Sequence, residues 1–161
     1  MFLRIELYQG ALLLGMQQIQ TFQEHTTPQL WTRFMPQVAG IPHRIDNCLL
    51  SAEVFDADFF NPFDIKKPYR KWAGVRVLPH TETPTGMSLL MIPEGLYAVF
   101  LHKGLGADAE KIYRYIFLEW LPQSGYSLDL RPHFAVMPPE YKRHDPEAEE
   151  EIWIPILETR E

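Results

Sequence analysis

The residues that offer the clearest chemistry are three consecutive glutamates, 149–151, followed by the alternating apolar segment 152–156. Successive side chains of a β-strand point to opposite faces, so the three isoleucines of this segment would share one face. Glu151 and Trp153 would then share the other face. A carboxylate beside aromatic rings suits a lipophilic cation, through charge pairing and cation–π contact. The same carboxylate, if desolvated, could act as a general acid or base.

Other chemistries find little support among the residue types. No two of the six histidines stand at helical metal-ligand spacing, and the single cysteine, Cys48, begins an apolar run that is typical of a core. The chain has neither a glycine-rich phosphate loop nor a Gly-x-Ser-x-Gly motif. We therefore expect no metal, no cofactor and no serine nucleophile.

Composition restricts the class of partner. The 161 residues correspond to one ordinary domain, with 46% hydrophobic and 13% aromatic residues. The formal charge is −6, and no basic cluster exceeds the one at 66–71, so nucleic acids and anionic membrane surfaces are disfavoured. No apolar run approaches the roughly 18 residues of a membrane span, and the first residues do not form a signal peptide. These features predict a cytoplasmic protein.

The elements that would position Glu151 come from an approximate internal repeat. A glycine followed by an apolar strand occurs at 10–14 and again, 85 positions later, at 95–99. An aromatic-apolar-Pro-Gln sequence ends a helical stretch at 34–37 and again, 86 positions later, at 120–123. The agreement of the two offsets predicts a duplication, with repeat 1 at about 1–78 and repeat 2 at about 86–157.

Both repeats are predicted to have the order β-α-β-β. The expected strands of the first repeat cover 4–22, 49–55 and 72–78, around a helix at 27–40. Those of the second cover 87–102, 127–137 and 151–156, around a helix from about Asp108 to Leu121. Neither unit buries its sheet face alone, so the two should pair about a pseudo-twofold axis. The predicted fold class is α+β, with an antiparallel sheet, helices packed on one side and a central ligand cleft.

Four segments of the chain match a known family. Residues 95–100, 119–122, 131–134 and 150–156 resemble the GyrI-like small-molecule-binding domains, which are similar to the effector-binding domains of AraC-type and MerR-type transcription activators. The resemblance covers essentially the whole chain. The chain offers no room for a helix-turn-helix domain beside this one, so we do not expect it to bind DNA directly.

The resemblance implies a cleft between two repeats that binds lipophilic and often cationic compounds. In this family a glutamate on the final strand commonly faces the cleft among aromatic residues, and Glu151 matches that position. The implied aromatic walls are Tyr97, Trp120, Phe134, Trp153 and Trp72. Apart from the resemblance, Tyr141 in the polar loop of the second repeat could close over the cleft, and a plain surface role is the alternative.

Three functions remain open. The first is a stand-alone effector-binding or sequestering protein, linked to transcription regulation by the resemblance. The second is a small-molecule hydrolase, with Glu151 as acid or base, assisted by Tyr97 or Tyr141. The third is a gyrase-inhibitor-like module that contacts a protein partner through the acidic stretch 145–151.

Overall fold

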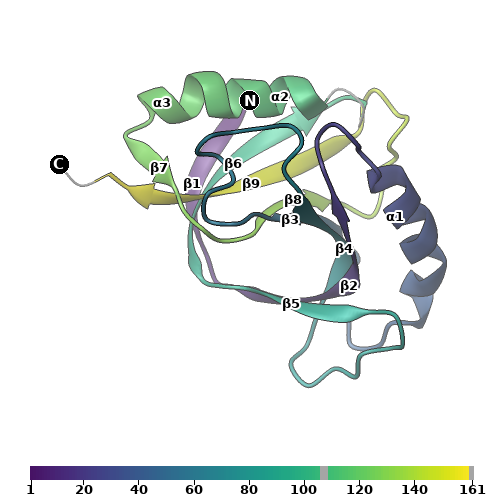
Figure 1. The fold of residues 1–161 in the computed structure, drawn as a ribbon. Helices are drawn as coiled ribbons and strands as arrows, with labels where there is room; N and C mark the ends of the chain where they lie inside the picture. Colours follow the sequence, from purple (N-terminus) through teal and green to yellow (C-terminus); the bar gives the residue numbers. More distant parts are fainter. Residues whose placement is uncertain (106–108, 160–161) are drawn as a thin grey trace.

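A computed structural model describes residues 1–105 and 109–159. The elements in chain order are β1 (Phe2–Tyr8), β2 (Ala11–Gln20), α1 (Thr27–Phe34), the 3-10 helix η1 (Met35–Gly40), β3 (Leu49–Val54), β4 (Tyr69–Val77), β5 (Ser88–Ile92), β6 (Gly95–Lys103), α2 (Ala109–Tyr115), the π-helical turn η3 (Ile116–Trp120), α3 (Leu121–Gln123), β7 (Tyr126–Leu128), β8 (His133–Met137) and β9 (Glu149–Glu158). Figure 1 shows their arrangement. The predicted start of the second helix at about Asp108 lies outside the described residues.

Each half of the chain contains one more strand at its start than the sequence predicts. The expected strand 4–22 divides into β1 and β2 at Gly10, whose φ of 89° is accessible to glycine at little cost. The expected strand 87–102 likewise divides into β5 and β6, because Pro93 lies between them and cannot donate to a strand ladder. The expected strand 127–137 also divides, into β7 and β8. The predicted order β-α-β-β is therefore corrected to β-β-α-β-β in the first half of the chain and to β-β-α-β-β-β in the second.

The main strands form one antiparallel sheet in the order β1-β6-β9-β8-β3-β4-β2-β5, and β7 pairs with β9. The pairing of β3 with β8 joins the two halves of the sheet. At its ends the sheet exchanges strands between the halves: β1 pairs with β6 of the second half, and β5 pairs with β2 of the first. This exchange places side chains from the start of the chain beside those of the last strand.

The helices pack on one side of the sheet, as predicted. Leu30 and Phe34 are fully buried, one turn apart on α1, and pack against strands β2 and β4. Ile116 of η3 packs with Ile152 and Ile154 of β9. Figure 1 shows α1 and the α2–α3 segment over different parts of the sheet. Within residues 1–105 and 109–159, no helix combines the length and the apolar character that crossing a bilayer requires.

The other face of the sheet carries its own core, which we call the inner cluster. Its members come from eight strands, including both edge strands, and are Tyr8, Leu13, Leu50, Ala52, Trp72, Ile92, Tyr97, Val99, Phe134 and Trp153. Side chains from the two edges meet in one cluster because the sheet curls around this face, as Figure 1 shows. The inner cluster therefore brings the two halves of the chain into contact.

Candidate functional site

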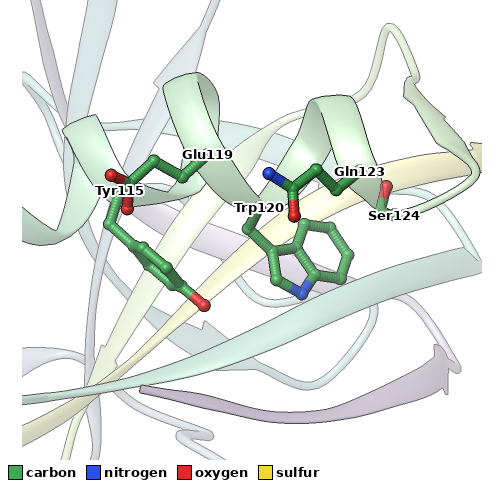
Figure 2. A pocket seen from close by; sticks show the side chains of 5 residues that line it. All are labelled: Tyr115, Glu119, Trp120, Gln123 and Ser124. Carbon is green, nitrogen blue, oxygen red and sulfur yellow. The ribbon is translucent and has the colours of Figure 1, made fainter.

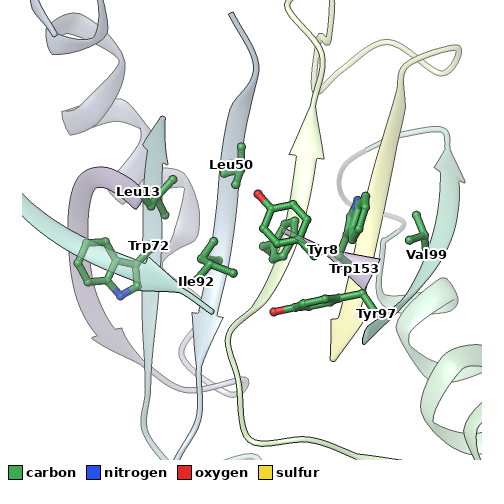
Figure 3. Close-up of a cluster of buried hydrophobic side chains, with 10 residues drawn as sticks. Tyr8, Leu13, Leu50, Trp72, Ile92, Tyr97, Val99 and Trp153 are labelled. Carbon is green, nitrogen blue, oxygen red and sulfur yellow. The ribbon is translucent and has the colours of Figure 1, made fainter. Parts of the chain in front are cut away.

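Four rings of the inner cluster, which we call the four-ring cluster, pack against one another. They are Tyr8, Tyr97, Phe134 and Trp153, from β1, β6, β8 and β9. Every pair among them has ring centroids between 5.0 and 5.9 Å apart. Such contacts add about 0.5–1.5 kcal/mol per pair to the area buried. Figure 3 shows three of these rings facing one another across the strands.

Glu151 lies on β9 two residues before Trp153. The structure places Ile152 and Ile154 beneath the helices and Trp153 in the inner cluster, so Glu151 belongs to the inner side of the strand. Its side chain is 34% exposed. The carboxylate thus lies at the rim of the four-ring cluster, in contact with both solvent and protein.

Arg4 of β1 contacts this carboxylate. Its Nη1 and Nη2 donate to the Oε2 and Oε1 of Glu151 at 3.2 and 3.4 Å, and its Nε donates to Glu6 at 2.7 Å. The guanidinium carbon also lies 5.5 Å from the ring centroid of Trp153, within cation–π range. The hydrogen bonds that Arg4 donates to Glu6 and Glu151 raise its pKa, so the guanidinium remains charged.

Tyr97 is fixed by its surroundings. Its hydroxyl donates to the carbonyl of Pro132 at 2.8 Å, and the guanidinium of Arg131 lies 4.7 Å from its ring centroid. Arg131 in turn donates to Asp129 at 2.6 Å and to two backbone carbonyls of β6 and β9. Burial raises the pKa of the Tyr97 hydroxyl well above its usual value. Tyr97 is therefore a neutral wall residue whose single proton is already donated.

Trp72 lies in the inner cluster on β4, in the first half of the chain. Like Trp153, it is almost fully buried, at 4% and 5% exposure respectively. In the described part of the chain, the indole Nε1 of each is buried without a hydrogen-bond acceptor. Two unused donors in an otherwise apolar interior are uncommon and call for a physical explanation.

The structure does not bring Trp120 to the four-ring cluster. Trp120 packs on the helix side of the sheet, with ring centroids 5.1 Å from those of Phe2 and Phe100. It also lines a hollow of about 450 Å³ at the surface of this segment (Figure 2). The other lining residues are Tyr115, Glu119, Gln123 and Ser124. Trp120 is separated from the four-ring cluster because the apolar stripe of η3 packs on the helix side of the sheet, whereas the four rings occupy the inner face.

Tyr141 makes no ring contact with the four-ring cluster among the residues that the structure describes. Its amide donates to the carbonyl of Pro138 in a turn. Burial and the nearby Glu150 raise the pKa of Tyr141 to about 12. Glu150 lies on the helix side of β9, because it alternates with Glu151 along the strand.

The sequence reasoning missed three residues of the site, Arg4, Glu6 and Tyr8. Arg4 is paired in register with Val99 and Glu6 with Tyr97, which puts both on the inner face of β1. Arg4, Glu6 and Tyr8 have the spacing i, i+2, i+4, which places two opposite charges and an aromatic ring on one face of a strand. This spacing could have indicated their place in the site.

A further small hollow, of about 200 Å³, lies between the loop at 55–61 and the loop at 128–133. His133 on its wall is surrounded by aromatic rings, with that of Phe55 at 4.9 Å and that of Phe60 at 6.0 Å. Burial, with a smaller effect from Arg131, lowers the pKa of His133 to about 3. The imidazole is therefore neutral in the folded protein at ordinary pH.

The fold and the site together define a class of protein: an α+β domain whose sheet has helices on one face and an aromatic core with a carboxylate at its rim on the other. Residues 1–157 match the GyrI-like small molecule binding domain, and the chain belongs to this family. No curated protein matches the chain significantly.

Several solved structures share the fold. SAV2435, in a structure bound to tetraphenylphosphonium, is 13% identical with a TM-score of 0.69, over 98% of this chain and 94% of that one. The EcmrR C-terminal domain is 15% identical with a TM-score of 0.73, over 98% and 99%. A hydrolase encoded by lin2189 from Listeria innocua is 11% identical with a TM-score of 0.57, over 96% and 91%. At these identities the likeness establishes the fold alone.

Proposed function

We propose that the protein binds a small lipophilic cation on the inner face of its sheet and acts in the cytoplasm as an effector-binding or sequestering protein. Glu151 supplies the negative charge. Tyr97, Phe134 and Trp153 supply the apolar wall, with Trp72 on the side of the other repeat. Membership in the GyrI-like family supports this proposal, and so does the tetraphenylphosphonium bound by the structurally similar SAV2435.

The observation that carries the proposal is the position of Glu151. A carboxylate that is 34% exposed at the rim of a buried aromatic cluster attracts a cation without being fully desolvated itself. An aromatic face adds about 0.5–2 kcal/mol for a cation placed over it. The combination favours large cations with delocalised charge, because they give up little hydration when they contact rings.

We further infer that the binding region is a cleft between two repeats, at about 1–78 and 86–157, related by a pseudo-twofold axis. The strand order supports this inference, because it reads the same from either end when each strand is exchanged for its counterpart. The counterparts are β1 with β5, β2 with β6, β3 with β8, and β4 with β9. The exchange makes Trp72 on β4 and Trp153 on β9 residues of equivalent strands.

The four rings are in contact in this structure, so a ligand must seat at the rim or part the rings. The rim is the more accessible position, because the side chains of Arg4, Glu6 and Glu151 are 39%, 42% and 34% exposed. A cation that enters there meets the carboxylate and the ring of Trp153 before any buried side chain has to move.

Titration with tetraphenylphosphonium, followed by intrinsic tryptophan fluorescence and by calorimetry, tests the proposal. Glu151→Gln should weaken binding about threefold to tenfold, as expected for loss of one partly exposed charge contact. Glu158→Gln is the matched control, since it makes the same change at the exposed far end of β9, about 23 Å along the strand. Equal affinity of the wild type and Glu151→Gln would refute the assigned role of the carboxylate.

A hydrolase that uses Glu151 as acid or base is the second candidate, and the fold shared with the hydrolase encoded by lin2189 favours it. Two contacts weigh against it here: both oxygens of Glu151 accept from Arg4, and the Tyr97 proton is donated to Pro132. Turnover of an electrophilic small molecule that is lost in Glu151→Gln, with the fold intact, would establish hydrolysis.

A further inference from the structure

Arg4 reaches the candidate site through the exchange of edge strands. It lies on β1, the first strand of the chain, which pairs with β6 and not with its sequence neighbour β2. The register aligns Arg4 with Val99 of β6, and Val99 with Trp153 of β9. The long arginine side chain therefore extends across one strand to the ring of Trp153 and the carboxylate of Glu151.

The contacts of Arg4 are the same in kind as those assigned above to the ligand. A delocalised cation lies 5.5 Å from the Trp153 ring centroid and pairs with both oxygens of Glu151. The site is thus already occupied by a cation that belongs to the chain. The charge of Glu151 is balanced as long as this guanidinium stays in place.

We propose that Arg4 is a displaceable internal cation, which a lipophilic cation must move aside in order to bind Glu151 and Trp153. This inference rests on the proposed function and adds a specificity-determining residue to it. Arg4 therefore competes with the ligand. A cation binds only if its interaction free energy with the rings and the carboxylate is more favourable than that of the guanidinium. Large apolar cations meet this condition, and small hydrated ones do not.

The structure provides a second partner for the displaced side chain. The Nε of Arg4 donates to Glu6 at 2.7 Å, a shorter contact than either one to Glu151. The side chains of Arg4 and Glu6 are both partly exposed, so their pair can persist in water after Glu151 has been released. Two carboxylates facing one guanidinium also leave this rim with a net negative charge, which favours an incoming cation.

The variant Arg4→Gln tests the inference, with three probes of closely related shape: tetraphenylphosphonium, the isosteric anion tetraphenylborate, and the neutral triphenylphosphine oxide. Freeing Glu151 should tighten tetraphenylphosphonium binding about threefold to tenfold. It should weaken tetraphenylborate binding and leave the neutral probe within about a factor of two. Arg33→Gln is the control, because it removes an exposed guanidinium from α1, on the helix side of the sheet.

A double-mutant cycle separates displacement from a merely structural effect. In the Glu151→Gln background, Arg4→Gln should tighten tetraphenylphosphonium binding less than it does in the wild type, because there is no carboxylate left to free. Circular dichroism of each variant checks that the fold is retained. If the wild type binds tetraphenylphosphonium and Arg4→Gln gains nothing over it, the inference about Arg4 fails while the proposed function stands. If no variant binds tetraphenylphosphonium at all, both fail together.

Discussion

Trp72 and Trp153 occupy the same inner cluster from opposite halves of the chain, and each carries a buried indole Nε1 without an acceptor among the described residues. A buried donor without a partner costs about 1–3 kcal/mol. Two such donors, on β4 and β9, leave the inner cluster with unused hydrogen-bonding capacity. A hydrogen-bond acceptor on a bound molecule, or an ordered water, would satisfy them.

Fluorescence can distinguish the inner face of the sheet from the helix side. We expect Trp153→Phe to abolish most of the quenching caused by tetraphenylphosphonium and to weaken its binding about twofold to fivefold, since an indole face is the strongest cation–π partner. Trp120→Phe is the matched control, because Trp120 packs on the helix side. Quenching titrations of both variants check this. A larger loss of quenching in Trp120→Phe than in Trp153→Phe would place the ligand on the helix side of the sheet and contradict our proposal.

Much of the fold was predictable because the sequence patterns are local. The helix at 27–40 and the strand at 151–156 follow from apolar spacing, and the structure has helical turns and a strand there. The extra strand at the start of each half was missed because the two-residue breaks at 9–10 and 93–94 interrupt the apolar pattern only slightly. Exchange of β1 and β5 between the halves depends on long-range pairing, which no local pattern records.

The candidate site was predictable to the extent that it follows from alternation along one strand. Glu151 and Trp153 could be placed together in this way, whereas Trp120 could not be assigned to a face before the packing of its helix was known. Arg4 was missed because its partner is 147 positions away in the sequence. A charge pair of that separation is visible only once the strand order is known.

A buried ion pair lies on the helix side of the sheet. The Lys71 ammonium donates to the Glu53 carboxylate across the β3–β4 pair, with side chains that are 8% and 12% exposed. Lys71→Met leaves Glu53 unpaired near the buried Glu150, so the free energy of unfolding should fall by about 3–5 kcal/mol. Urea denaturation at pH 7 measures the loss.

The companion to Lys71→Met is the double variant Lys71→Met, Glu53→Leu. Removing both charges leaves no unpaired carboxylate at this position, so most of the lost stability should return. If the double variant were as unstable as Lys71→Met alone, the loss would come from packing of the lysine stem and not from the unpaired charge.

His133 predicts a pH dependence of stability. Its pKa is lowered to about 3 in the folded protein, by burial first and by Arg131 second, against about 6.5 in the unfolded chain. Between these values the unfolded chain binds a proton that the folded protein does not, so stability falls as pH falls. The contribution of His133 should decrease by about 2 kcal/mol between pH 7 and pH 5.

Replacing His133 with Phe removes the imidazole that binds a proton in the unfolded chain. An aromatic side chain also suits a position surrounded by aromatic rings. The free energy of unfolding of His133→Phe, measured relative to wild type by urea denaturation, should rise as pH is lowered from 7 to 5. Glu150 titrates with the opposite sign, because burial raises its pKa, but it is common to both proteins and cancels in the difference. His144→Gln, at an exposed position, should show no such trend; a parallel trend would refute the assignment to His133.

Gly95 is required by the close approach of Arg131. A Cβ at this position would overlap with Nη1 and Cζ of Arg131, the guanidinium that covers the ring of Tyr97. Gly95→Ala must therefore displace Arg131 from its acceptors and should destabilise the protein by about 2 kcal/mol, as overpacking usually does.

Gly40→Ala is the control, since a Cβ there meets nothing within 4 Å and its backbone is not in the left-handed region, so the change should stay within about 0.5 kcal/mol. In the Arg131→Gln background, Gly95→Ala should cost less than in the wild type, because the clashing group is gone. Equal unfolding free energies for Gly95→Ala and Gly40→Ala would show that Arg131 can move aside without cost.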